Sequence, residues 1–254
     1  MKKLTFILLL YILLAANLIA GTGNSIPKSS RQFVIVITDS LTATSGNLYC
    51  FDRNTPSKAW KPWNKAIEVS LGRSGLGMGY GLHDTLSLSK LPPKKEGDGR
   101  SPAGIFELSA VFGYESIEEM DNLNMPYIHI TEMIECVDDP NSDFYNQIVS
   151  NQKPASKIDW HSSEKMSRAG IYYEQGIVVE HNTNPVSKGA GSCIFLHNWA
   201  KLFETTAGCT VMEPADLSKI IDWLESENNP VLVQLTQQLY NDLKERWKLP
   251  EITK

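Results

Sequence analysis

The feature that most constrains this chain is the apolar run at residues 192–197, which reads as a buried strand ending in His197. Side chains alternate across a β-strand, so Cys193, Phe195 and His197 are expected to share one face. Twelve residues after His197 comes Cys209, directly behind a glycine. A strand that ends in histidine, followed by an excursion and a Gly-Cys turn, predicts that an imidazole and a thiol meet. Such a pairing lowers the pKa of a thiol and produces a nucleophilic thiolate.

The other cysteines leave two interpretations open. Besides Cys209 the chain holds Cys50, Cys136 and Cys193. A nucleophilic Cys209 leaves an odd number, so one disulfide with a buried thiol and no disulfide at all are both compatible with the count. Cys209 itself fits a bridge or a buried structural cysteine as the alternative to a nucleophile, and Cys193 fits a core position.

Composition narrows the class of protein. The chain has 254 residues, of which 42% are hydrophobic and 21% charged, which predicts one globular domain with a large core. Its formal net charge of −5 excludes the basic footprint of a nucleic-acid-binding protein. No repeat of solenoid or propeller length is visible in the sequence.

The N-terminus has the pattern of an export signal. Two lysines precede a nearly continuous apolar run over residues 4–16, and small residues follow. We predict a signal peptide over residues 1–23, a linker over residues 24–32 and one domain over residues 33–254. An uncleaved anchor is the alternative, but the apolar run is short for a membrane span. The mature protein is expected to be exported, with no stable membrane span after cleavage.

Strand patterns dominate the chain up to residue 212. β-Branched residues fill residues 33–38, a second strand is expected over residues 47–51, and residues 66–71 alternate as in a half-exposed strand. Beyond residue 212 the apolar period becomes helical. The fold class is therefore predicted as mainly β, a single sandwich or open barrel with C-terminal helices packed outside it.

Two helices are expected after residue 212. Pro214 suits a first helical position, and apolar residues then recur at helical spacing as far as Leu224. The sequence Asn-Asn-Pro at residues 228–230 is expected to end this helix. A final helix is expected from Val231 onward, with a strand over residues 231–235 as the alternative for its beginning.

A glycine-rich segment at residues 72–83 has the wrong spacing for a phosphate-binding loop, because no Gly-Lys-Ser/Thr follows. A close-packed loop whose backbone needs positive φ is the favoured interpretation. The alternative is a loop beside a substrate groove, in which Arg73 offers a fork of donors to a carboxylate.

Three further polar residues are candidates for substrate binding. Asp138 and Asp139 stand before a proline, which favours a surface turn, with a grip on a cationic amine as the functional alternative. Their spacing lacks the regularity of a calcium site. His181 follows an apolar run, and either a backbone-satisfied structural role or a place in the active site fits it.

Several segments together resemble the L,D-transpeptidase family of bacterial cell-wall enzymes. That family carries a histidine, a variable spacer, and then Ser or Thr, one residue, Gly and Cys, which His197 and residues 206–209 match. The resemblance covers roughly residues 66–236 and includes four further segments. These are KKEGDGRSPAGIF at residues 94–106, ECVDDPNSDFYNQIV at residues 135–149, DWHSSEKM at residues 159–166 and GIVVEHN at residues 176–182.

The resemblance implies acyl transfer on peptidoglycan stem peptides, in the periplasm or cell-wall space, without a cofactor or a metal. Cys209 would attack an L,D peptide bond and His197 would act as the base, oriented by the backbone carbonyl of Asn198. The backbone at Gly208 would stabilise the oxyanion, and Thr206 would contact substrate. An amine would release the thioester to give a cross-link. The resemblance also implies acylation by carbapenem-type inhibitors.

Two positions depart from the family pattern. Many members have a second histidine where this chain has Ala207, and Asn or Arg where it has Val211, so acceptor specificity is not carried over. A carboxypeptidase or amidase that uses the same Cys–His pair is the main alternative. Two others are a zinc site formed by His181, His197 and Cys209, and a wall-binding module without activity.

Overall fold

The computed structural model describes residues 26–120, 122–152 and 158–252. The predicted signal peptide and the first two residues of the predicted linker lie outside the described residues. In the part of the chain that is described, no helix is long and apolar enough to cross a membrane.

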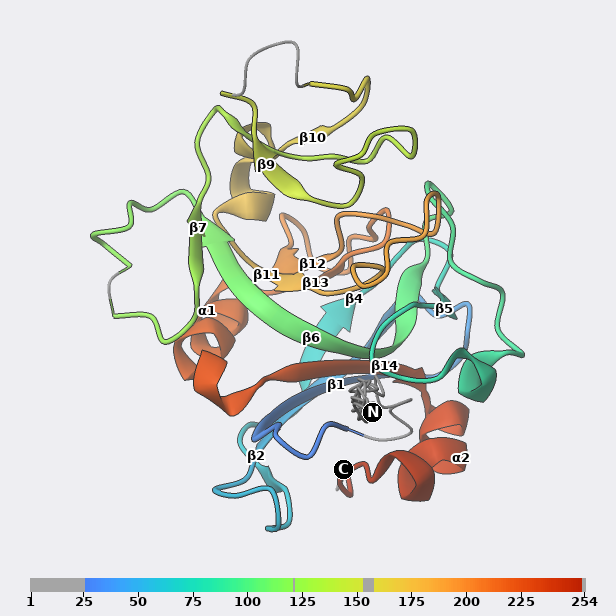
Figure 1. Cartoon of the computed structure of the whole chain (residues 1–254). Helices are drawn as coiled ribbons and strands as arrows, with labels where there is room; N and C mark the ends of the chain where they lie inside the picture. The colour runs from blue at the N-terminus through green and yellow to red at the C-terminus, as the bar shows by residue number, and fades with distance from the viewer. Residues whose placement is uncertain (1–25, 121, 153–157, 253–254) are drawn as a thin grey trace, which may run out of the picture.

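The described residues form short strands through most of the chain and two α-helices near its end (Figure 1). The strands are β1 (Gln32–Thr38), β2 (Ser45–Asp52), β3 (Lys61–Pro62), β4 (Ile67–Ser70), β5 (Leu76–Met78), β6 (Ser101–Gly113), β7 (Tyr127–His129), β8 (Ile134–Cys136), β9 (Ile148–Ser150), β10 (Glu164–Lys165), β11 (Gln175–Val179), β12 (Phe195–Asn198), β13 (Thr210–Met212) and β14 (Val231–Thr236). The helices are α1 (Pro214–Trp223) and α2 (Gln237–Trp247).

The main sheet closes on itself as a barrel. Around the ring the strands follow the order β1, β14, β6, β11, β12, β13, β4 and β2, and β2 pairs with β1 to complete it. Strands β3, β5 and β7 add to the edges of this ring. The predicted mainly-β domain with helices outside is confirmed, and the sheet is a closed barrel rather than a sandwich or an open barrel. Closure removes the edge strands that an open sheet would expose.

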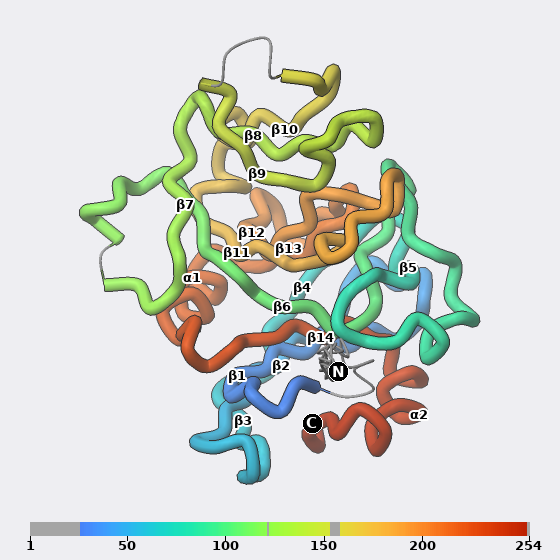
Figure 2. Tube along the Cα trace, viewed as in Figure 1, coloured from blue at the N-terminus to red at the C-terminus, as the bar shows by residue number. Residues whose placement is uncertain are grey.

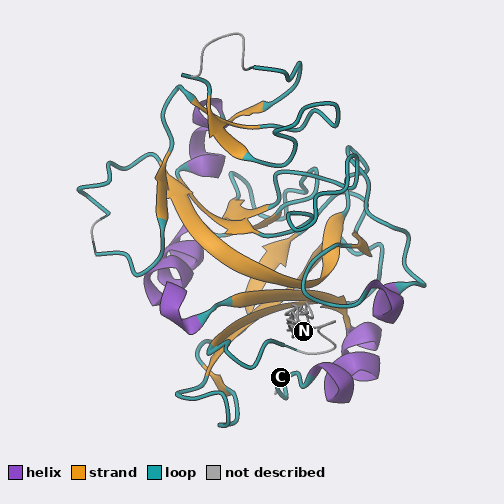
Figure 3. Cartoon of the chain, in the orientation of Figure 1, coloured by secondary structure: helices purple, strands orange, loops and turns teal. Residues whose placement is uncertain are grey.

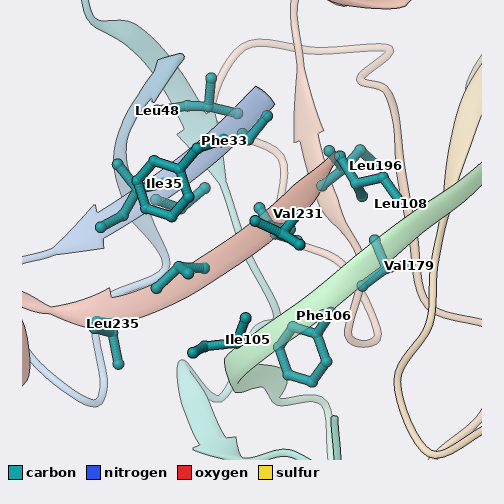
Figure 4. Packing of buried hydrophobic residues seen from close by; sticks show 14 of the residues in the cluster. Phe33, Ile35, Leu48, Ile105, Phe106, Leu108, Val179, Leu196, Val231 and Leu235 are labelled. Atoms are coloured by element: carbon teal, nitrogen blue, oxygen red, sulfur yellow. The ribbon is translucent and has the colours of Figure 1, made fainter. Parts of the chain in front are cut away.

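The barrel is held together by apolar burial. Every residue of β1 is buried, as its uninterrupted apolar run predicts for a strand covered on both faces. Figure 4 shows side chains of β1, β2, β6 and β14, among them Phe33, Leu48 and Phe106, gathered in one cluster. Burying each such side chain contributes roughly 1.5–3 kcal/mol.

The helices cover the outside of the barrel (Figure 3). Helix α1 packs against β11 and β12, and α2 packs against β14 and β1. Helix α1 ends at Trp223, earlier than the Asn-Asn-Pro sequence predicts, because Leu224 already has an extended backbone. The start of the last segment is a strand: β14 is buried at every residue and lies between β1 and β6. Helix α2 begins after it, where Thr236 accepts the N–H of Leu239.

A second, smaller sheet of β10, β8 and β9 stands beyond one end of the barrel, at the top of Figure 2. A disulfide between Cys136 of β8 and Cys193 ties it to the segment that leads into β12. This bridge answers the question that the cysteine count left open, and Cys50 is the buried free thiol. Cys193 has a φ of 55°, so β12 begins at Phe195 and is shorter than the strand predicted over residues 192–197.

Candidate active site

The pairing of β12 with β13 brings the predicted histidine and cysteine into one cavity. The two strands are parallel, and His197 lies opposite Val211. Cys209 stands two residues before Val211, so alternation along the strand turns both side chains to the face that carries His197. All three residues line a cavity of about 240 Å³.

The thiol of Cys209 is hydrogen-bonded to backbone in the resting structure. Its Sγ–H donates to the carbonyl of Cys193 at 3.5 Å, and Sγ accepts the N–H of Phe195 at 3.4 Å. The disulfide-bonded residue therefore supplies the acceptor for the thiol's hydrogen. The imidazole shares the cavity but is not the thiol's hydrogen-bond partner in this state.

His197 is held by a backbone carbonyl and by aromatic rings. Its Nδ1 lies 2.8 Å from the carbonyl oxygen of Asn198, the group to which the family resemblance assigns this contact. A carbonyl only accepts, so Nδ1 carries the proton and the ring's lone pair lies on Nε2. The ring stands edge-on to Tyr172 and Tyr173, with centroids 6.1 and 5.2 Å away.

Burial decides the protonation states of the pair. It lowers the pKa of His197 to about 4, against the opposing effect of backbone carbonyls. Burial also raises the pKa of Cys209 to about 12, helped by the charge of Glu164 and opposed by Lys94. Both groups are therefore neutral near pH 7. The expectation that the pairing lowers the thiol pKa is wrong for the resting protein, because removal from water outweighs the other effects.

Hydrogen bonds within the loop before Cys209 stabilise its conformation. The hydroxyl of Thr206 donates to the carbonyl of Cys209 at 2.6 Å and accepts the N–H of Gly208 at 3.1 Å. Ser101 also donates to the Cys209 carbonyl, at 3.2 Å. The N–H of Gly208 must leave the Thr206 hydroxyl before it can serve an oxyanion. Thr206 lines the cavity, but its hydroxyl is engaged in shaping the loop.

The glycine-rich segment contacts this loop through the backbone, because the N–H of Arg73 donates to the carbonyl of Thr206 at 2.9 Å, and it does not line the cavity. A side chain at Gly72 would meet the carbonyl of Gly99, and Gly75 has a φ of 75° against the carbonyl of Leu41. The segment is thus the close-packed loop that its composition favours. The guanidinium of Arg73 donates to the Gly97 carbonyl at 3.2 Å, and Arg73 is not among the described residues that line the cavity.

The structure does not bring the other three candidates to the cavity. The carboxylate of Asp139 accepts the N–H groups of Asn141 and His161, both at 2.9 Å, so it shapes a turn rather than gripping a cation. Asp138 precedes it on the same turn. His181 is buried, accepts the N–H of Tyr80 and faces the carbonyl of Ala190, and burial lowers its pKa to about 3.

A different set of side chains completes the cavity. Glu164, Tyr172, Tyr173 and Glu204 line it together with the cysteine and histidine. Glu164 lies within the segment DWHSSEKM that carries the family resemblance, which was the available signal for it. Its direction was not predictable, because β10 has two residues and two residues show no alternation.

Among the described residues, no group of three or more His, Cys, Asp or Glu is arranged to hold a metal ion. Backbone groups engage both ring nitrogens of His181, one of the three ligands of the alternative zinc site.

Comparison with known proteins agrees with the geometry. The family model described as YkuD, L,D-transpeptidase catalytic domain, matches residues 34–233. No curated protein matches the chain. The matched span runs from β1 into β14 and therefore takes in the whole barrel, the small sheet and the cavity.

Proposed function

The chain belongs to the L,D-transpeptidase catalytic domain family, and on that premise we propose that it transfers acyl groups between peptidoglycan stem peptides through Cys209. The observation that carries this proposal is the shared cavity of Cys209 and His197, in which a backbone carbonyl fixes the imidazole. As a family member exported to the periplasm or cell-wall space, the protein would act in wall biogenesis and cell shape.

The reaction begins from a neutral pair. Nε2 of His197 accepts the thiol proton as Sγ of Cys209 attacks the carbonyl of the L,D peptide bond. The imidazolium then protonates the leaving amine, and a thioester remains on Cys209. General acid–base help of this kind contributes about 10²–10⁴ in rate. The thiol must leave the Cys193 carbonyl to reach the imidazole, so substrate binding has to turn the Cys209 side chain.

The oxyanion develops beside the loop of residues 206–209. The N–H groups of Gly208 and Cys209, which are adjacent to the nucleophile in the sequence, are the proposed oxyanion donors. One oxyanion donor contributes about 2.7–4 kcal/mol to catalysis. Gly208 would exchange its Thr206 contact for the oxyanion at this step.

An amine or water then breaks the thioester. Attack by an amine of a second stem peptide gives a cross-link, whereas attack by water gives carboxypeptidase or amidase activity from the same pair. Exclusion of water from the cavity decides between them.

The test is incubation with a disaccharide tetrapeptide, followed by mass spectrometry of the protein and the products. We expect an acyl adduct on Cys209 and a cross-linked dimer, and both should be absent with Cys209→Ala. Cys50→Ala is the matched control, because that thiol is buried in the barrel. Turnover by Cys209→Ala refutes the nucleophile, and products without a dimer favour the hydrolase.

A further inference from the structure

The cavity is lined by two carboxylates, and Lys94, whose charge acts on Cys209, does not line it and is paired with Asp98. Glu164 and Glu204 both face it, and no lysine or arginine is among the described residues that line it. His197 is neutral near pH 7, because burial lowers its pKa to about 4. The lining therefore complements a positively charged group.

The small sheet positions Glu164 so that its side chain lines this cavity. Ser163 and Lys165 both donate to Glu135, on one face of the strand. Glu164, which lies between them in the chain, does not share this contact and lines the cavity instead. It pairs in register with Cys136, whose disulfide joins the segment before β12.

Glu164 has little within the protein to stabilise its charge. The hydroxyl of Tyr173 donates to it at 2.8 Å, and no ion pair involves it among the described residues. Its other charged neighbours are Asp138 and Glu96, which repel it, so burial and repulsion raise its pKa to about 6. Glu164 is half-buried, and a carboxylate partly removed from water with no cation beside it costs stability.

Glu204 repeats this arrangement within the same cavity. Tyr172 donates to one of its oxygens at 2.8 Å, and its second oxygen is buried without a hydrogen-bond partner in the described structure. The cavity thus has two carboxylates, each held by one tyrosine and each with capacity for a further donor.

We propose that Glu164 is a specificity-determining residue that binds an ammonium group of the wall peptide in the catalytic cavity. This inference rests on the proposed function. The ammonium has two possible sources, the side-chain amine of a dibasic residue in the donor and the amine of the acceptor.

The experiment compares matched substrates. One donor tetrapeptide carries a free side-chain amine at its third residue and the other carries the same amine acetylated. Thioester formation on Cys209 is followed by intact mass in a single turnover, and aminolysis is then followed with and without an added amine acceptor. A charge-assisted hydrogen bond is worth about 1.5–3 kcal/mol, so we expect a preference of roughly 10- to 100-fold for the cationic partner.

Glu164→Gln should bring this preference close to one. The loss is expected in the donor arm if the donor supplies the ammonium, and in the acceptor arm if the acceptor supplies it. Glu118→Gln, which removes an equal charge from the exposed surface, should keep it. If Glu164→Gln retains the full preference in both arms, or if the wild-type protein shows none, the inference is overturned. Absence of any thioester, even with the acetylated donor, instead refutes the proposed function.

The pH dependence gives a second readout that a merely structural role would not move. The groups facing Glu164 are Tyr173, Cys209, Asp138 and Glu96. In the wild-type protein the preference should fade as the pH drops through about 6, where the carboxylate takes up a proton. Tyr173→Phe removes the hydroxyl that favours the charged form, so the midpoint should move to higher pH. An unchanged midpoint contradicts the role of Glu164.

Discussion

The barrel and the small sheet that stands over the active site are stabilised in different ways. The barrel closes through long strands such as β6 and β1, and its interior is apolar. The small sheet has strands of two or three residues and is stabilised by a disulfide, by a small apolar cluster of Val137, Val149 and Trp160, by the contacts of Asp139 and by the donors around Glu135. The barrel therefore holds the larger apolar core, and the small sheet supplies Glu164, one of the two carboxylates that line the cavity.

A truncation in the barrel core should have the largest effect. Phe106→Ala removes a fully buried ring and leaves a cavity, so we expect the free energy of unfolding to fall by about 3–5 kcal/mol. Chemical denaturation monitored by circular dichroism measures this. Both regions should be lost together. Separate transitions would show that the small sheet folds independently of the barrel.

Loss of the disulfide should cause the second-largest loss of stability, and it should act mainly on the small sheet. Cys136→Ala opens a link between residues 57 positions apart, which is expected to cost about 2–4 kcal/mol. Hydrogen exchange should accelerate in β8 and β9 far more than in β1. A reductant should reproduce this in the wild-type protein and add nothing to Cys136→Ala. Equal acceleration in β1 would contradict the division between the regions.

Neutralising Glu164 should have a smaller effect, and it should raise the free energy of unfolding rather than lower it. Its pKa is raised in the folded protein, so its contribution to stability is complete at low pH and is lost as the pH rises through about 6. At pH 8, Glu164→Gln should therefore stabilise the fold by up to about 2 kcal/mol. Below pH 4 the gain should vanish. A destabilised variant at pH 8 would assign Glu164 a structural role.

The smallest expected effect is a shift in the pH dependence of activity, at the active site where the barrel and the small sheet meet. The imidazole of His197 acts as a base only when it is neutral, and burial lowers its pKa to about 4. The acid limb of kcat/KM for the acetylated donor should lie near pH 4. A limb near pH 6.5 would mean that the histidine is solvated in the free enzyme.

The parts that could be predicted from the sequence are those with long local patterns. The strand at residues 33–38 and helix α1 follow from uninterrupted apolar runs and a helical period. The strand β14 is harder to predict, because its apolar spacing also fits a helix. Only its place between β1 and β6 determines that it is a strand.

The candidate site shows the same limit. Cys209 and His197 could be predicted because they belong to one continuous stretch whose strand pairing brings them together. The link between Cys136 and Cys193 and the direction of Glu164 depend on contacts between distant segments. The rise in the thiol pKa depends on burial, which spacing along a sequence does not encode.

The neighbouring positions of β1 and β14 also set the order of assembly. Phe33 pairs with Val231, roughly 200 residues further along, and contacts at such separation slow folding. During synthesis β1 has no neighbour on that side until β14 has emerged. A chain from which β14 has not yet emerged therefore cannot complete the barrel that carries the imidazole and the thiol.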